Sequence, residues 1–173
     1  MNYAQINKID VAQGVGCRVS VFFQGCRGFM VDGKLSHCKD CFNSEIWSFS
    51  DGKLFDNEAK KELFEYLSKP YIKGLSVLGG EPLQQGQELV DLLKEVKETF
   101  KDKDIWLWTG YYIDGREELD DIQKEILSLC DYVVDGRFEE DKKDLTLKFR
   151  GSSNQTIWEM NSQGIFIKSK LNE

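Results

Sequence analysis

Short apolar runs alternate with amphipathic helical patterns through the middle of the chain, and this alternation constrains the fold more than any other feature. Strand-like runs with a period of two, or short buried runs ending in glycine, cover 17–26, 74–80, 104–108 and 130–136. Helical periodicity covers 56–69, 87–100 and 116–129. Strands that alternate with helices at this spacing predict βαβ units, and therefore an α/β fold with a parallel sheet and outer helices.

The length of the chain limits how far such a sheet can extend. At 173 residues it is long enough for one domain, whereas a full eightfold barrel needs about 250 residues. We therefore expect a single unit, 1–173, with a partial barrel or an open sheet. Ligands of such sheets bind beyond the carboxyl ends of the strands, which is where the segments QGC, LGGEP, WTG and VDG fall.

Composition and charge narrow the classes of partner. The chain begins MNYAQINKID, with neither an apolar run nor a basic flank, and no window approaches the ~20 apolar residues of a membrane span. We expect a cytoplasmic protein without a membrane partner. Its formal net charge of -7 argues against a nucleic-acid surface and favours small-molecule or protein partners.

Three of the five cysteines, Cys26, Cys38 and Cys41, form a C-x11-C-x2-C pattern. In a reducing compartment such thiols indicate metal binding or catalysis before disulfides. Zinc, with His37 or Cys17 as fourth ligand, is one interpretation, and redox chemistry of the C-x-x-C pair is another. The third is a [4Fe–4S] cluster with three protein ligands, which leaves one iron open. Cys17 and Cys130 follow apolar stripes and are expected to be buried small hydrophobes.

Several further segments occur together in the chain. They are MNYAQI, the D-V-x-x-G-x-G-x-R start at 10–18, FxxGC at 22–26, CxxCFN at 38–43, LSVLGGEPL at 75–83, DIWLWTGY at 104–111, VVDGRF at 133–138 and LKFRGSSNQ at 147–155. With them the chain resembles the activating enzymes of anaerobic (class III) ribonucleoside-triphosphate reductase, which belong to the radical S-adenosylmethionine (radical SAM) superfamily. The resemblance covers nearly the whole chain.

The resemblance implies a partial (βα)6 TIM-like barrel and an oxidoreductase chemistry. Cys26, Cys38 and Cys41 would hold a [4Fe–4S] cluster whose open iron binds S-adenosylmethionine (SAM). An electron from a donor such as a flavodoxin or ferredoxin would cleave SAM, and the resulting radical would leave a glycyl radical on the reductase. Activation of another glycyl-radical enzyme, or a zinc-stabilised module without enzymatic activity, remains an alternative.

The resemblance also implies SAM contacts at the strand ends. The expected residues are Asp40, Phe42, Gly79, Gly80, Glu81, Thr109, Asp135 and Arg137. Glycines let a backbone approach a ligand closely, and Glu81 is able to accept from a cationic amine. Tight turns and simple packing are the structural alternatives at these positions. Arg137 stands where related activases usually have lysine, and its planar fork differs from a lysine's point donor.

The spacing of the first two cysteines departs from the usual C-x3-C of the superfamily. Lengthening a loop from three residues to eleven costs only about 1 kcal/mol in chain entropy, so a cluster is still expected. Within the insertion at 27–37, Asp32 and Gly33 stand between apolar residues, which is a strong hairpin signal. We therefore predict a hairpin over 29–36, placed beside the cluster or the partner surface.

Overall fold

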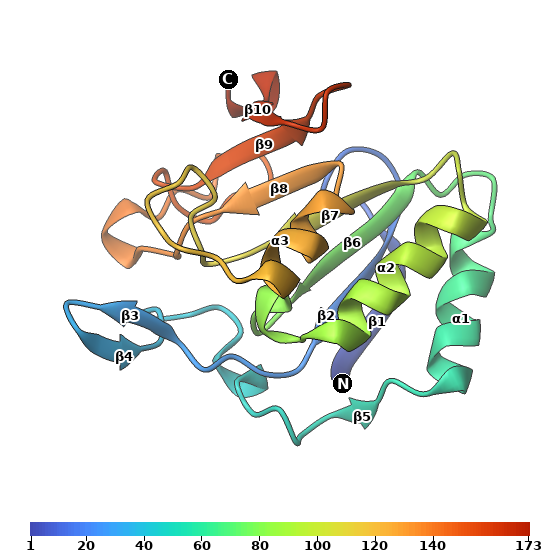
Figure 1. Ribbon diagram of the computed structural model, residues 1–173, viewed down its shortest axis with the longest axis horizontal. Helices are drawn as coiled ribbons and strands as arrows, with labels where there is room; N and C mark the ends of the chain where they lie inside the picture. The colour runs from blue at the N-terminus through green and yellow to red at the C-terminus, as the bar shows by residue number, and fades with distance from the viewer.

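The computed structural model describes residues 1–173 as an α/β fold built on one large sheet (Figure 1). The strands of this sheet are β1 (Asn2–Asp10), β2 (Arg18–Phe23), β5 (Lys53–Leu54), β6 (Gly74–Gly79), β7 (Asp104–Trp108), β8 (Tyr132–Asp135), β9 (Thr156–Met160) and β10 (Phe166–Lys168). The helices are α1 (Asn57–Leu67), α2 (Gln87–Thr99) and α3 (Asp121–Ser128). Short 3-10 turns are η1 (Ser44–Ile46), η2 (Pro82–Gln84), η3 (Glu140–Lys142) and η4 (Lys170–Asn172). None of the helices combines the length and apolarity needed to cross a bilayer.

The sheet is mixed and open, with the strand order β10-β9-β8-β7-β6-β2-β1-β5. Its centre is parallel, because β2, β6, β7 and β8 are joined through the three helices. On one side β1 and β5 add antiparallel strands, and on the other side β9 and β10 do the same. The α/β class is as the alternation predicts, but the expected partial (βα)6 barrel is wrong.

The physical reason lies in the connections at the two ends of the sheet. A barrel unit needs a helical crossover after each strand, and the chain supplies only three. The connection between β1 and β2 covers only residues 11–17, which suits an antiparallel pair. From 136 to 155 the chain has no helix longer than η3, so β9 returns antiparallel to β8. The sheet therefore ends in edge strands on both sides.

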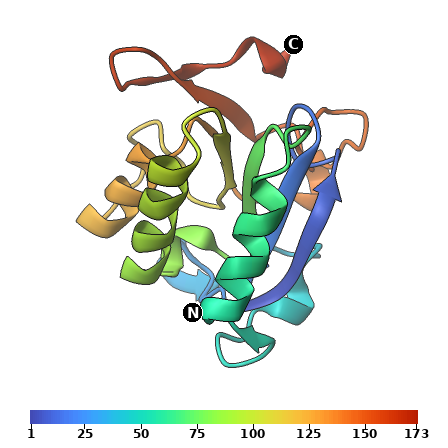
Figure 2. The same ribbon diagram turned by 90° about the vertical axis from the view of Figure 1, so that its right-hand side faces the viewer.

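The helices cover one face of the sheet (Figure 2). Their apolar stripes meet alternate residues of the strands in a buried cluster of 21 side chains, including Val19, Val77, Leu93, Leu107 and Ile126. Helix α3 is shorter than the predicted 116–129 because Asp120 forms a capping box with Gln123, and this fixes the start of the helix at Asp121. Cys130 is buried, as expected for a small hydrophobe, whereas Cys17 is only half-buried.

The opposite face of the sheet carries larger and more polar side chains, among them Arg18, Ser76 and Trp106, all fully buried. Arg18 forms an ion pair with Asp104, Nη1 to Oδ1 2.6 Å, and donates from Nε to the Ser76 hydroxyl over 2.7 Å. Ser76 in turn donates to the carbonyl oxygen of Gln13 over 2.6 Å. This relay fixes the 11–17 connection across the face that the helices leave uncovered.

Two short strands, β3 (Phe29–Val31) and β4 (Lys34–Ser36), stand outside the large sheet and pair with each other in antiparallel register. Asp32 and Gly33 form the turn between them with φ of 49° and 75°, the left-handed values that a type I′ hairpin turn requires. The hairpin projects from the body of the molecule next to the segment that carries the cysteines (Figure 1).

Candidate functional site

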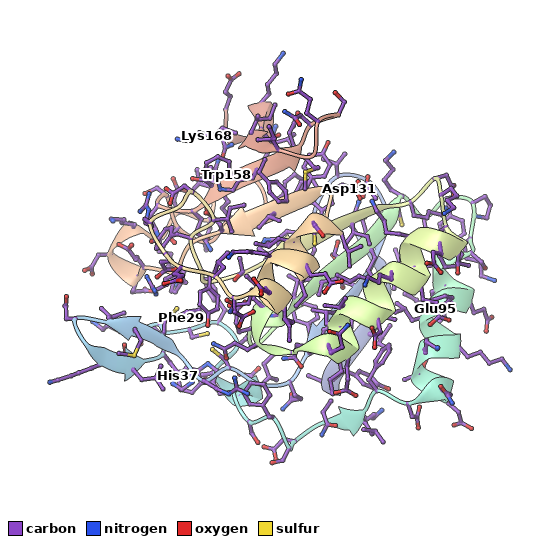
Figure 3. All side chains as sticks on the ribbon, viewed as in Figure 1. Phe29, His37, Glu95, Asp131, Trp158 and Lys168 are labelled. Atoms are coloured by element: carbon purple, nitrogen blue, oxygen red, sulfur yellow. The ribbon has the colours of Figure 1, made fainter.

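A cavity of about 450 Å³ opens over the face of the sheet that lacks helices, where β2, β6 and β7 end. That volume lies in the range of small-molecule sites. Cys26, Cys38 and Cys41 all line it. Figure 3 shows Phe29 and His37 at the root of the hairpin, beside a group of sulfur atoms. The location agrees with the expectation that a ligand binds beyond the strand carboxyl ends.

Each of the three thiols meets a backbone N–H. Gly28 N donates to Cys26 Sγ and Asn43 N donates to Cys41 Sγ, both over 3.4 Å, and the backbone of Phe138 donates to Cys38. Burial raises the pKa of Cys26 to about 12 and also raises the pKa of Cys38. The Cys26 thiol is therefore protonated at neutral pH, and a metal centre bound there would have to displace its proton.

Three thiols that line one cavity are a donor set that an iron–sulfur cluster takes. No three His, Cys, Asp or Glu side chains converge closely enough to ligate one metal ion. A [4Fe–4S] cube would bind each thiolate through a different iron. A structural zinc site instead needs four ligands on one ion.

His37, considered from the sequence as a fourth zinc ligand, is held at the root of the hairpin by two contacts. Its ring stacks on Trp47, with centroids 3.8 Å apart and an interplanar angle of 13°. Its Nε2 donates to the carbonyl oxygen of Cys26 over 2.7 Å. This hydrogen bond leaves Nδ1 as the ring nitrogen with which His37 could still bind a metal.

Gly79 and Gly80 allow the end of β6 to pack against the segment that leads to Cys26. A Cβ on Gly79 would lie 2.1 Å from the carbonyl oxygen of Phe23, and one on Gly80 would lie 2.2 Å from that of Gly25. Two backbone bonds use this closeness, Gly80 N to Phe23 O at 2.9 Å and Glu81 N to Gly25 O at 2.7 Å. The glycines therefore position Cys26 as well as lining the cavity.

Glu81 is buried at the floor of the cavity and ties two strand ends together. Its Oε1 accepts from Leu83 N at 2.9 Å and from the Thr109 hydroxyl at 2.7 Å, and its Oε2 accepts from Gly110 N at 2.8 Å. Burial raises the pKa of Glu81 to about 7, although the three donors oppose that shift. A carboxylate has about four acceptor positions, so these three bonds leave one of them unused.

The other residues predicted from the sequence divide into two groups. Phe42 and Thr109 line the cavity, and Phe42 packs on Phe138 with centroids 4.6 Å apart. Asp40, Asp135 and Arg137 do not line it.

Asp40 is exposed, with a φ of 53°. Asp135 is buried, and its Oδ2 accepts from Ile113 N over 2.9 Å. Arg137 pairs with Glu117, and its guanidinium lies over the ring of Phe29 at 5.1 Å.

Sequence reasoning missed two amides that organise the site. Asn43 donates from Nδ2 to the carbonyl oxygen of Gly79 over 3.2 Å, which joins the cysteine segment to β6. Gln84 accepts from Arg27 N over 2.7 Å and donates to the carbonyl oxygen of Gly28 over 3.1 Å. Asn43 is the last residue of the CxxCFN motif and Gln84 directly follows GGEPL, and these positions were the only signal in the sequence.

The family model described as "4Fe-4S single cluster domain" matches residues 12–158, most of the chain. This match places the chain in the class of single-cluster 4Fe-4S proteins. Curated relatives sharpen this result. The anaerobic ribonucleoside-triphosphate reductase-activating protein of Enterobacteria phage T4 is 40% identical to this chain. Those of Pasteurella multocida and Vibrio cholerae are 37% and 39% identical to it.

These matches cover 96%, 91% and 91% of this chain and 98%, 97% and 97% of the relatives. The chain belongs to the family of anaerobic ribonucleoside-triphosphate reductase-activating proteins. The comparisons thereby confirm the family resemblance that the motifs carry.

Proposed function

We propose that this protein activates an anaerobic ribonucleoside-triphosphate reductase by radical SAM chemistry, generating a glycyl radical on it. The observation that carries the proposal is the set of three thiols around one cavity, in a chain whose family model is a single-cluster 4Fe-4S domain. Cys26, Cys38 and Cys41 would hold a [4Fe–4S] cluster. Three protein ligands leave one iron open for a small molecule.

The residues of the cavity have separate tasks in this proposal. Gly79 and Gly80 admit SAM close to the backbone, and the remaining acceptor position of Glu81 takes its ammonium group. Thr109 orients Glu81 through their hydrogen bond. Phe42, at the cavity edge, packs against the adenine. Asp40, Asp135 and Arg137 do not line the cavity, and they contribute to SAM binding from positions outside it.

A cluster held by these cysteines would supply one electron, taken from a flavodoxin or ferredoxin, for the cleavage of SAM to methionine and a 5′-deoxyadenosyl radical. That radical would remove a hydrogen atom from a glycine of the reductase. The walls of the cavity shield this chemistry, since 14 of the 25 lining residues are hydrophobic. The reductase must cover the opening, because its glycine has to reach the interior.

Anaerobic reconstitution tests the proposal. The protein is expected to bind close to four iron and four sulfide per chain, and to form 5′-deoxyadenosine when reduced with SAM. With the reductase present, electron paramagnetic resonance is expected to detect a glycyl radical. Replacing Cys26, Cys38 or Cys41 singly by serine should abolish these signals, whereas Cys17→Ser should retain them. A colourless protein with one zinc per chain and no 5′-deoxyadenosine would refute the proposal.

A further inference from the structure

The side-chain amide of Gln84 holds the backbone that directly follows Cys26. Its Oε1 accepts from Arg27 N over 2.7 Å, and its Nε2 donates to the carbonyl oxygen of Gly28 over 3.1 Å. Nε2 also donates to the Tyr111 hydroxyl over 3.0 Å. The two backbone bonds lie on either side of the peptide that links Arg27 to Gly28. The amide therefore fixes the orientation of that peptide.

Gly28 is a residue that needs such support. Its φ is 82°, in the left-handed region, and a Cβ there would lie 2.6 Å from the carbonyl oxygen of Ser36. The position therefore demands glycine, which has more backbone freedom than any other residue when contacts are absent. The bonds from Gln84 remove this freedom at the start of the cysteine insertion.

The peptide that Gln84 orients points its N–H at a candidate cluster ligand. Gly28 N donates to Cys26 Sγ over 3.4 Å, and both residues are buried. Water does not compete for this contact, and the local dielectric is low. The N–H dipole therefore acts more strongly on charge at the sulfur than it would at the surface.

This contact bears on how easily a cluster at the site accepts an electron. One-electron reduction adds negative charge to an iron–sulfur cluster and its thiolate ligands. An N–H that donates to a ligand sulfur stabilises this charge, and such hydrogen bonds are among the factors that set the reduction potential. The Gly28 N–H would therefore raise the potential of a cluster held by Cys26. Gln84 does not line the cavity, so it acts through the backbone that it holds.

We propose that Gln84 is a positioning residue, which aims the Gly28 N–H at Cys26 Sγ and thereby makes the cluster easier to reduce. This inference rests on the proposed function, because that function requires the cluster to accept an electron from a donor. The first residue after the GGEPL motif thus tunes the cluster without touching it or its small-molecule ligand.

Gln85, the next residue, provides a matched comparison. Its Nε2 donates to the carbonyl oxygen of Gln24 over 2.9 Å and to that of Glu81 over 3.3 Å. It is therefore a second amide that holds the backbone beside the cysteine segment, here two residues before Cys26. Neither of its bonds involves the peptide of Gly28. Gln85→Met removes backbone hydrogen bonds of the same kind and leaves the N–H that meets the sulfur in place.

The experiment is an anaerobic redox titration of the reconstituted full-length protein, with the reduced cluster measured by electron paramagnetic resonance. Gln84→Met keeps the length of the side chain and removes both of its hydrogen-bonding groups. The equilibrium constant for one-electron reduction of the cluster should fall about three- to tenfold, and tenfold corresponds to about 59 mV for a one-electron couple. Gln85→Met should leave the potential unchanged.

An unchanged potential in Gln84→Met, or an equal shift in Gln85→Met, would overturn the inference. If Gln84→Met retains no cluster, Tyr111→Phe takes its place, because it removes one of the three partners of the Gln84 amide. The potential should then fall by a smaller amount, and an unchanged potential in Tyr111→Phe would count against the role of Gln84.

The proposed function is decided by a separate measurement on the unmodified protein. If that protein holds the cluster but makes no 5′-deoxyadenosine when reduced with SAM, the proposed function fails. The comparison of reduction potentials among the variants still decides the role of Gln84, because it requires the cluster alone.

Discussion

Gly80→Ala is predicted to damage the frame that holds Cys26 in place. The added Cβ would stand 2.2 Å from the carbonyl oxygen of Gly25. Because the neighbouring atom is backbone, no side-chain rotation relieves the clash, and β6 has to move away by about 1 Å. Such a movement lengthens the bond from Glu81 N to Gly25 O from 2.7 Å to about 3.7 Å, beyond hydrogen-bond range.

Two contributions set the loss in free energy of unfolding that Gly80→Ala should cause. Overpacking at a rigid site costs about 1–3 kcal/mol. The loss of the bonds from Gly80 N and Glu81 N adds about 1 kcal/mol each. The free energy of unfolding should therefore fall by about 4 kcal/mol, which for a chain of this size lowers the melting temperature by about 8–16 °C. The protein still folds, but Cys26 is displaced and cluster retention decreases.

Thermal unfolding of the cluster-free protein measures the loss of stability, and iron content after anaerobic gel filtration measures the loss of cluster. Gly151→Ala is the matched control, because the atom nearest its new Cβ is the Phe42 ring at 3.0 Å, and that half-exposed side chain is free to shift. Gly151→Ala should lower the melting temperature by only a few degrees. Equal melting temperatures for the two variants would show that the close approach of β6 to the Cys26 segment has no energetic weight.

Three further substitutions test other parts of the site. Glu81→Gln replaces one acceptor oxygen by an amide NH2, so a buried donor loses its partner and the free energy of unfolding should fall by about 1–3 kcal/mol in urea titration; an unchanged midpoint would contradict this. Arg18→Met leaves Asp104 without its cation and should lower the free energy of unfolding by about 3–5 kcal/mol in the same titration. Lys103→Met is the comparison, because the Lys103 ammonium donates to a backbone carbonyl oxygen. His37→Phe keeps the ring over Trp47 and should retain the cluster in iron assays, whereas His37→Ala should lose part of it. Complete loss in both variants would favour a ligand role for His37.

The central part of the fold follows from the sequence because its signals are local. Alternating periods of two and 3.6 predict the four parallel strands and three helices, and the Asp32–Gly33 pair predicts the hairpin turn. The barrel does not follow, since closure depends on segments without such a pattern. Residues 137–155 have no helical period, and the structure gives them only the short turn η3. The resemblance extended the βα pattern to six units where the chain provides three helices.

The cavity was predictable where a motif ends a strand, and unpredictable where bonds join distant segments. QGC and LGGEP follow β2 and β6, and neighbouring parallel strands bring their ends together. The orientation of Arg137 depends on Glu117, twenty residues away in a loop without regular structure. The contacts of Gln84 reach back 56 and 57 residues. No local pattern encodes such pairings.

Both ends of the cysteine segment depend on contacts with the GGEP segment, which the sequence did not suggest. Gly79 and Gly80 pack on the strand end before Cys26, and Asn43, two residues after Cys41, donates to the carbonyl oxygen of Gly79. Both sides of the cysteine segment therefore rest on the same turn that would contact SAM. A change in this turn should alter cluster retention and SAM affinity together. Thr109→Val removes a hydroxyl that bonds only Glu81 and the loop that follows β7, so it should weaken SAM binding and leave the iron content unchanged. If iron content and SAM affinity also separate in Gly79 variants, the two sites do not share this support.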